Sequence, residues 1–181
     1  MIDSAWGPFL FDTSAESWLG RQRSEAVQIW WSGYLARHQV HVSAATVIER
    51  VRGYGLLWRT CPEDDRARIE KARLAYLRQG RHVWPIDAAV AVIAGEIMAL
   101  VPNPPTPPVR GHKAAESRVD RLARWRFDVI IAATAIARNI RLVHNNPGDF
   151  EAIREAMERE PVRFRGLGPL SLVRCGSLIP E

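Results

Sequence analysis

The sequence of 181 residues has only two cysteines, Cys61 and Cys175, and neither belongs to a CxxC pair or to a Cys/His pattern with the spacing of a zinc site. Isolated cysteines are typical of a reducing compartment, so we expect free thiols and a cytoplasmic protein. No apolar stretch approaches the ~20 residues that span a bilayer. The amino terminus also has no basic start followed by a long apolar run, so the sequence predicts neither a membrane span nor a secretory signal.

Several motifs that define common enzyme classes are also missing. There is no GxxxxGK[ST] phosphate loop, no GxGxxG, no HExxH and no Gly-x-Ser-x-Gly elbow. These absences argue against a P-loop nucleotide hydrolase, a dinucleotide-dependent enzyme, a zinc peptidase and a serine hydrolase. Asp12 has no second aspartate two residues later, which argues against a haloacid-type phosphatase. No internal repeat is present.

The composition, 47% hydrophobic and 25% charged residues, is that of a soluble globular protein, and the length favours one domain over residues 1–181. The formal net charge is +5 and the isoelectric point about 9.9. A basic surface suits a polyanionic partner such as a nucleic acid. It is equally typical of a chain that is simply rich in arginine.

Short apolar runs alternate with helical stretches, which predicts an α/β fold with a mostly parallel sheet covered on both faces. Ser43 and Asp87 are expected to cap helices, and residues 60–63 resemble a capping box that opens another. We expect strands at residues 8–11, 41–43, 82–84 and 141–144, with a possible edge strand at 162–164. We expect helices at residues 24–37, 43–49, 63–79, 88–100, 114–124, 128–134 and 150–160, the fifth running into the sixth with or without a break.

Four carboxylates lie where this fold brings distant segments together. Asp12 ends the first apolar strand, and Asp149 follows the strand at 141–144 after a short turn. Glu49 and Asp128 lie on helical stretches. In open parallel sheets, ligands bind beyond the carboxyl ends of the strands, which is where Asp12 and Asp149 are expected.

Clustered carboxylates repel one another and raise each other's pKa, unless a cation lies among them. Oxygen ligands are those that Mg²⁺ and Mn²⁺ prefer. The pattern therefore suggests a metal-dependent site for phosphoryl transfer. Each acid also has a simpler interpretation. Asp12 and Asp149 could be turn residues, Glu49 a solvated helix residue, and Asp128 a helix cap.

Four segments, in order, resemble the motifs of PIN-domain nucleases, and in particular of VapC-type toxins. They are the segments around Phe9–Ser14, Val42–Glu49, Asp128–Ala135 and Leu142–Phe150, and the resemblance covers about residues 8–165, with an extension at 166–181. It implies a three-layer α/β/α domain and an endoribonuclease that depends on Mg²⁺ or Mn²⁺ held by Asp12, Glu49, Asp128 and Asp149. It further implies the toxin of a type II toxin–antitoxin pair, usually a homodimer bound by its cognate antitoxin.

Further residues are candidates for supporting roles. Asn146 is a candidate for orienting a carboxylate or a phosphate, and Thr13, Thr46 and Thr134 are weaker candidates. In the basic run from Arg110 to Arg126 we expect RNA-backbone contacts from Lys113, Arg118 and Arg121, or else only a solvated helix face.

The sequence also departs from the family pattern. His144 stands where the family usually has threonine, and the loop Pro102–Pro108 is longer than in a small toxin. The helix with Trp30 and Trp31 has more apolar surface than one buried face needs, which favours a dimer or antitoxin contact. Two alternatives to an endoribonuclease remain: a PIN-like RNA-binding or scaffold protein that does not cut, and a nuclease that acts on DNA.

Overall fold

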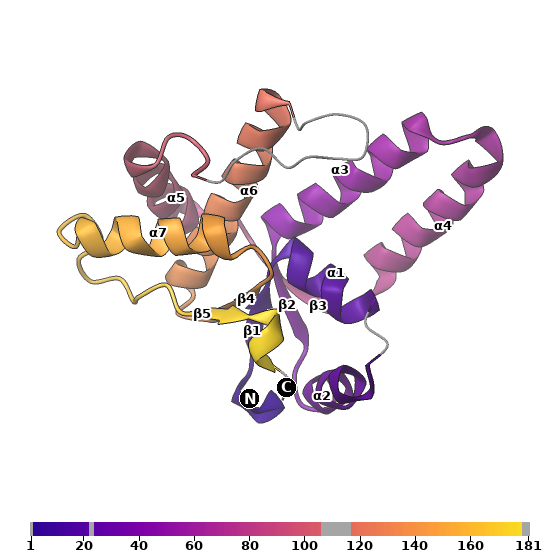
Figure 1. The fold of residues 1–181 in the computed structure, drawn as a ribbon, viewed down its shortest axis with the longest axis horizontal. Coiled ribbons are helices and arrows are strands. Elements are labelled where there is room, and N and C mark those ends of the chain that lie inside the picture. Colours follow the sequence, from indigo (N-terminus) through magenta and orange to yellow (C-terminus); the bar gives the residue numbers. More distant parts are fainter. Residues whose placement is uncertain (1, 22–23, 106–116, 179–181) are drawn as a thin grey trace.

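The computed structural model describes residues 2–21, 24–105 and 117–178, and within them five parallel strands form one sheet in the order β3-β2-β1-β4-β5 (Figure 1). The strands are β1 (Phe9–Phe11), β2 (Val40–Ser43), β3 (Arg81–Trp84), β4 (Arg141–His144) and β5 (Leu172–Arg174). Every pair of neighbouring strands is parallel. This arrangement confirms the expected α/β fold with helices on both faces of a parallel sheet.

The helices that connect the strands begin at side chains suited to helix starts. Ser43, Asp87 and Ser117 each accept a hydrogen bond from a backbone N–H of the first turn, as N-caps do. In the described ranges the helices are α1 (Thr13–Arg21), α2 (Glu25–Leu35), α3 (Ala44–Thr60), α4 (Glu63–Arg78), α5 (Ala88–Leu100), α6 (Arg118–Ala137) and α7 (Pro147–Arg159), with short 3₁₀ turns η1 (Ser4–Trp6) and η2 (Cys175–Leu178). No helix in these ranges is long and apolar enough to cross a membrane.

Alternate residues of the strands pack on opposite faces of the sheet, as the two-residue period of a strand requires. Leu10 of β1 joins a core formed with α5, α6 and α7. Phe9 and Phe11 join a second core formed with α1, α2 and η2. All three side chains are fully buried. Because both faces of β1 are buried, its carboxyl end is held firmly, and the residue that follows it is placed with little freedom.

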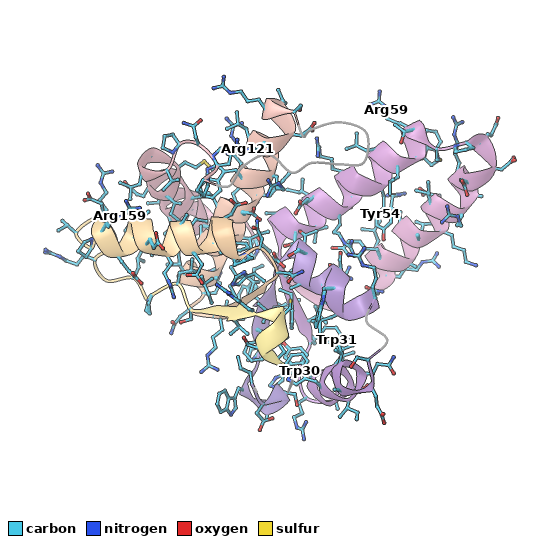
Figure 2. The ribbon with its side chains drawn as sticks, in the orientation of Figure 1. Trp30, Trp31, Tyr54, Arg59, Arg121 and Arg159 are labelled. Atoms are coloured by element: carbon cyan, nitrogen blue, oxygen red, sulfur yellow. The ribbon has the colours of Figure 1, made fainter. Side chains whose placement is uncertain are left out.

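Helix α2 buries more of its aromatic surface in the chain's own core than its sequence suggests. Tyr34 stacks on Phe9 with ring centroids 5.8 Å apart, and Trp30 stacks on Tyr34 at 5.5 Å. Trp30 is buried and Trp31 is half-buried (Figure 2). Ile29 remains on the outer side and is 66% exposed. Trp30 therefore needs no partner to cover it, whereas Trp31 and Ile29 still offer apolar contact surface.

Several details differ from the sequence-based expectations. Residues 162–164 do not form a strand, and the edge strand next to β4 is β5, which lies in the carboxy-terminal segment. Helix α1 was not expected. Thr60 ends α3 instead of capping α4, for which Pro62 is the N-cap without a side-chain hydrogen bond. Tertiary packing of α3 against α4 overrides the local capping pattern there.

Figure 1 shows α3 and α4 extending side by side from the sheet, and the two chain ends lie close together, where the Ile2 N–H donates to the Ser177 carbonyl (3.2 Å). Cys61 and Cys175 are free thiols. Asp87 caps α5 through Val90 and pairs with Arg138 (2.5 Å), as a structural cap would.

Candidate metal-dependent nuclease site

The acids from β1 and α7 meet at the carboxyl edge of the sheet. Asp12 follows β1 directly, and its N–H donates to the Val143 carbonyl at 3.0 Å, which continues the pairing with β4. Asp149 lies in the first turn of α7, which starts three residues after β4 ends. Since β1 and β4 are neighbours in the sheet, both carboxylates reach the same edge.

The other two acids come from helices that pack over this edge. Glu49 lies in α3 and Asp128 in α6. The hydroxyl of Ser43, the N-cap of α3, is hydrogen-bonded to the Thr134 hydroxyl of α6 (2.9 Å). Asp128 is in the middle of α6, which runs unbroken from Arg118. Asp128 is therefore not a helix cap, because Ser117 has that role. Its side chain is buried and points into the protein.

Asp128 interacts electrostatically with each of the other three acids. Burial raises the pKa of the Asp128 carboxyl well above its usual range, and the charges of Asp12, Asp149 and Glu49 raise it further. The nearby Arg124 lowers it. A carboxyl that interacts with three others experiences the like-charge repulsion that a divalent cation would relieve.

The pKa of Asp12 is also raised, and hydrogen bonds from neighbouring residues oppose the increase. Burial raises its pKa to about 7, against the opposing effect of hydrogen bonds from the Ser14 hydroxyl (2.7 Å) and the Ala15 N–H (2.5 Å). The charge of Glu49 adds to the increase in pKa. These donors fix the carboxylate at the start of α1. The turn alone could explain one hydrogen bond, but it does not explain a buried carboxylate that interacts with Glu49 and Asp128.

Asn146 and Arg124 hold the fourth acid. The Asn146 amide donates to Asp149 Oδ2 at 2.8 Å and to Asp128 Oδ2 at 3.2 Å, and so bridges two of the acids. Arg124 Nη1 lies 3.0 Å from the same Asp149 oxygen. The Asp149 side chain is completely buried and that of Arg124 is 25% exposed. The structure thus places Asn146 where the sequence suggested an orienting amide.

The three threonines differ in what they contact. Thr13 donates to Glu49 Oε2 at 2.5 Å and can orient that carboxylate. Thr134 bonds to Ser43 and to the Ile130 carbonyl, so it joins helices and does not contact an acid. The Thr46 hydroxyl is buried and has no hydrogen-bond partner in the described part of the chain.

His144 ends β4 as a buried ring that packs edge-on against Phe150, with centroids 5.1 Å apart. Burial lowers the pKa of His144, so the ring is neutral at pH 7. A neutral ring packed on an aromatic residue has a core role at this strand end.

The predicted RNA contacts fall in three different places. Lys113 and the last three residues of the Pro102–Pro108 loop lie outside the described residues. Arg118 is exposed in the first turn of α6. Arg121 donates to the Pro104 carbonyl at 2.7 Å and so anchors that loop (Figure 2).

Two residues that contact the acids were missed from the sequence. Ser14 was not singled out, although it follows Asp12 by two residues, a spacing from which a hydroxyl can return to the carboxylate. Arg124 was assigned to the basic run. Its spacing of four residues from Asp128 would have placed both side chains on one helix face, had α6 been interpreted as continuous.

The donor set fits a hard divalent cation, because it consists of carboxylate oxygens in a largely buried place. Within the described residues, no three His, Cys, Asp or Glu side chains already converge closely enough to ligate one ion. Each carboxylate instead accepts a hydrogen bond from a protein donor, and Asp149 also forms an ion pair with Arg124. Binding of an ion would require the carboxylates to draw together.

The sequence over residues 9–156 matches the model of the PIN domain, and the chain therefore belongs to the PIN domain family. The match begins at β1 and ends within α7, so it contains all four acids. None of the curated protein sequences matches the chain significantly.

Solved structures of toxin–antitoxin complexes have similar folds. VapBC2 from Rickettsia felis, bound to a DNA fragment from its promoter, aligns with a TM-score of 0.57 and 14% identity over 92% of this chain and 97% of that one. DNA-bound VapBC from Salmonella typhimurium gives 0.57 and 18%, with coverage of 92% and 97%. FitAcB from Neisseria gonorrhoeae gives 0.54 and 23%, covering 93% and 99%. At these identities the likeness concerns the fold.

Proposed function

We propose that this protein is a metal-dependent endoribonuclease that hydrolyses RNA phosphodiester bonds with Mg²⁺ or Mn²⁺. The observation that supports this most is the position of Asp128, a carboxyl whose pKa is raised by burial and, in addition, by the charges of three other acids. A cluster of buried like charges destabilises the fold. A role in binding a divalent cation explains why the protein has such a cluster. The PIN family membership supports the same class of chemistry.

In this proposal Asp12, Glu49, Asp128 and Asp149 hold the cation. When bound, it supplies an activated water and positive charge beside the scissile phosphate. Asn146 keeps Asp128 and Asp149 in a fixed relation through its two hydrogen bonds.

Three further residues assist. Thr13 and Ser14 orient Glu49 and Asp12 in the same way. Arg124, once released from Asp149, lies at a suitable place to contact the phosphate. No side chain of the protein is needed as a covalent nucleophile.

We further propose that the chain is the toxin of a toxin–antitoxin pair in the cytoplasm and forms a homodimer. The VapBC and FitAcB complexes among the structural neighbours support the antitoxin partner. An antitoxin could inhibit by placing an Arg or Lys side chain near the acids, where a cation is favoured. Size measurements of the purified chain, alone and with the product of the neighbouring reading frame, test both associations. A single monomeric species in both samples would contradict them.

The nuclease proposal is tested with RNA and DNA of one sequence, incubated with the purified chain in Mg²⁺ or Mn²⁺ and in excess EDTA. Cleavage of RNA that stops in EDTA is the expected result. Cleavage of DNA alone would favour a DNA nuclease. Binding of RNA without cleavage under any metal would favour the non-cleaving alternative.

A further inference from the structure

A cavity of about 680 Å³ lies between α1, α2, α3 and β3, next to the acid site. Its charged lining residues are Glu16, Arg21, Arg50 and Arg81, and its aromatic lining residues are Trp31 and Tyr54. Figure 2 shows Tyr54 between α3 and α4, and Trp31 on α2 beside this part of the protein. The cavity combines positive charge with flat aromatic surface.

The positive charge is held in place and exceeds the negative charge. Arg81 Nη2 lies 2.9 Å from Glu16 Oε1, and Arg50 Nε lies 3.6 Å from Glu16 Oε2. The side chains of Arg81 and Glu16 are only 7% and 10% exposed. Two guanidinium groups face one carboxylate, which leaves a net charge of +1 among these three. Such a buried excess of positive charge attracts an anion.

The Nη atoms of Arg81 already donate to the Tyr76 carbonyl (2.6 Å) and to Gln79 Oε1, whereas the Nε atoms of both arginines form no hydrogen bond in the described part of the chain. Both Nε atoms are buried. Buried donors without partners are unusual in folded proteins. Guanidinium groups bind phosphate oxygens through pairs of N–H donors, so a phosphate would satisfy these atoms.

An aromatic surface continues from the arginines. Arg81 and Arg50 lie over the Tyr76 ring, 3.9 and 5.3 Å from its centroid, which keeps both guanidinium groups in place. Tyr54 lies beside Tyr76, with centroids 6.1 Å apart, and lines the cavity itself. Aromatic rings stack on nucleic-acid bases without regard to sequence.

The cavity is continuous with the acid site. A second hollow of about 310 Å³ has Thr13, Glu49, Arg50 and Tyr54 among its lining residues. Arg50 and Tyr54 line both hollows. Glu49 and Arg50 are consecutive on α3, so one of the two arginines follows directly on one of the four acids.

We propose that this cavity binds the nucleotide adjacent to the cleaved bond of a single-stranded RNA. Arg50 and Arg81 hold its phosphate, Tyr54 stacks on its base, and Glu16 fixes the two arginines. This inference rests on the proposed function for the identity of the nucleic acid. The continuity with the acids favours RNA over a protein partner, because the substrate must extend from the site of cleavage.

The test measures binding of a short single-stranded RNA to full-length protein with Asp128→Asn, in EDTA, so that no cleavage occurs. Arg50→Gln should weaken binding by about tenfold and lower the salt slope of binding by roughly 0.7, the value for one lost phosphate contact. Tyr54→Leu should weaken binding with an unchanged slope. Arg159→Gln, at the distant end of α7 (Figure 2), is the matched control and should bind as the parent does.

Equal RNA binding by Arg50→Gln, Tyr54→Leu and the control would overturn the inference. Loss of antitoxin binding in these variants with unchanged RNA binding would also overturn it, and would assign the cavity to a protein. Because the assay does not use catalysis, the two proposals fail separately. A chain that cuts no RNA but loses RNA binding in Arg50→Gln keeps this inference and loses the nuclease proposal. Arg81→Lys, which retains the charge, provides a second variant if loss of Arg50 reduces folding.

Discussion

Arg124 Nη1 lies 3.0 Å from Asp149 Oδ2, so the fully buried acid of the site is in contact with a positive charge of the chain itself. Arg124 and Asp128 are four residues apart on α6, which places both on the side of the helix that faces the acids. The guanidinium lowers the pKa of Asp128, against the burial and the three acids that raise it. Arg124 is therefore part of the electrostatic balance of the site.

Replacing Arg124 with alanine should make the metal-free protein less stable and its Mn²⁺ binding tighter. Asp149 would be left buried without this charge partner. Removal of one partner from a fully buried pair costs roughly 3–5 kcal/mol, and partial exposure of Arg124 lowers our expectation to about 2 kcal/mol. The Mn²⁺ ion would then no longer compete with the Arg124 guanidinium for the Asp149 carboxylate. The affinity for Mn²⁺ should rise by about tenfold, or ~1.4 kcal/mol.

Chemical unfolding in EDTA and calorimetric Mn²⁺ titration measure these two effects. Arg126→Ala, an exposed position on the same helix, is the control and should change neither. Weaker Mn²⁺ binding by Arg124→Ala would show that the arginine supports the metal site and does not compete with the ion.

Metal-free stability should fall as the pH rises from about 4 to about 7. The pKa of Asp12 is 3.8 in its ordinary state and about 7 in the fold, mainly because of burial. Between these values the folded chain keeps a proton that the unfolded chain has lost, so the free energy of unfolding decreases with pH. The decrease from Asp12 amounts to about 4 kcal/mol, at about 1.4 kcal/mol for each pKa unit. Asp128 changes in the same direction.

Asp12→Asn removes the Asp12 contribution. Urea unfolding across this pH range in EDTA should give nearly equal stability for wild type and variant at the acidic end, and a more stable variant at the neutral end. An Asp12→Asn protein that is less stable than wild type at every pH would show that the carboxylate is satisfied by its hydrogen bonds and is not under charge repulsion.

Millimolar Mn²⁺ or Mg²⁺ should raise the melting temperature, because only the folded chain brings the four acids together. A concentration of about a hundred times the dissociation constant adds roughly 2.7 kcal/mol to the free energy of unfolding. Asp128→Asn should lose most of this shift, whereas Asp64→Asn, an exposed acid on α4, should keep it. An equal shift in both variants would place the ion elsewhere.

The basic start of α6 should affect RNA binding through Arg118 and not through Arg121. Arg118 is exposed, whereas Arg121 already donates to the Pro104 carbonyl. Arg118→Ala should lower the salt slope of RNA binding by roughly 0.7 and leave the cleavage position unchanged, since phosphate contacts carry no sequence information. An unchanged slope would mean that this face of α6 is only solvated.

Much of the fold could be predicted from local pattern. The runs at Phe9–Phe11 and Arg141–His144 are short, apolar and followed by turn residues, and both form strands at the centre of the sheet. What failed depended on tertiary contacts. Leu172–Arg174 is a strand because it pairs with β4, and its three residues have too little pattern to reveal this beforehand. The 162–164 segment has β-branched and aromatic residues but forms turns.

The site was predictable where the fold geometry fixes it and missed where side chains meet across elements. Asp12 and Asp149 follow neighbouring strands, so the parallel-sheet rule is enough to bring them together. The contact of Arg124 with Asp149 joins α6 to α7, and no sequence spacing predicts it. Thr134 was expected to support the acids, but its hydroxyl joins α6 to Ser43 and contacts no acid.

The most direct test of a single acid site that cuts RNA is the cleavage rate of one short RNA in saturating Mn²⁺, measured for wild type, Asp128→Asn and Asp64→Asn. Wild type and Asp64→Asn should cut at the same rate, and EDTA should stop both. Asp128→Asn should fold normally and should cut at least roughly a hundredfold more slowly than wild type. A hundredfold is the scale of losing one catalytic electrostatic contact. Cleavage by Asp128→Asn at the wild-type rate, or wild-type cleavage that persists in EDTA, would contradict the account.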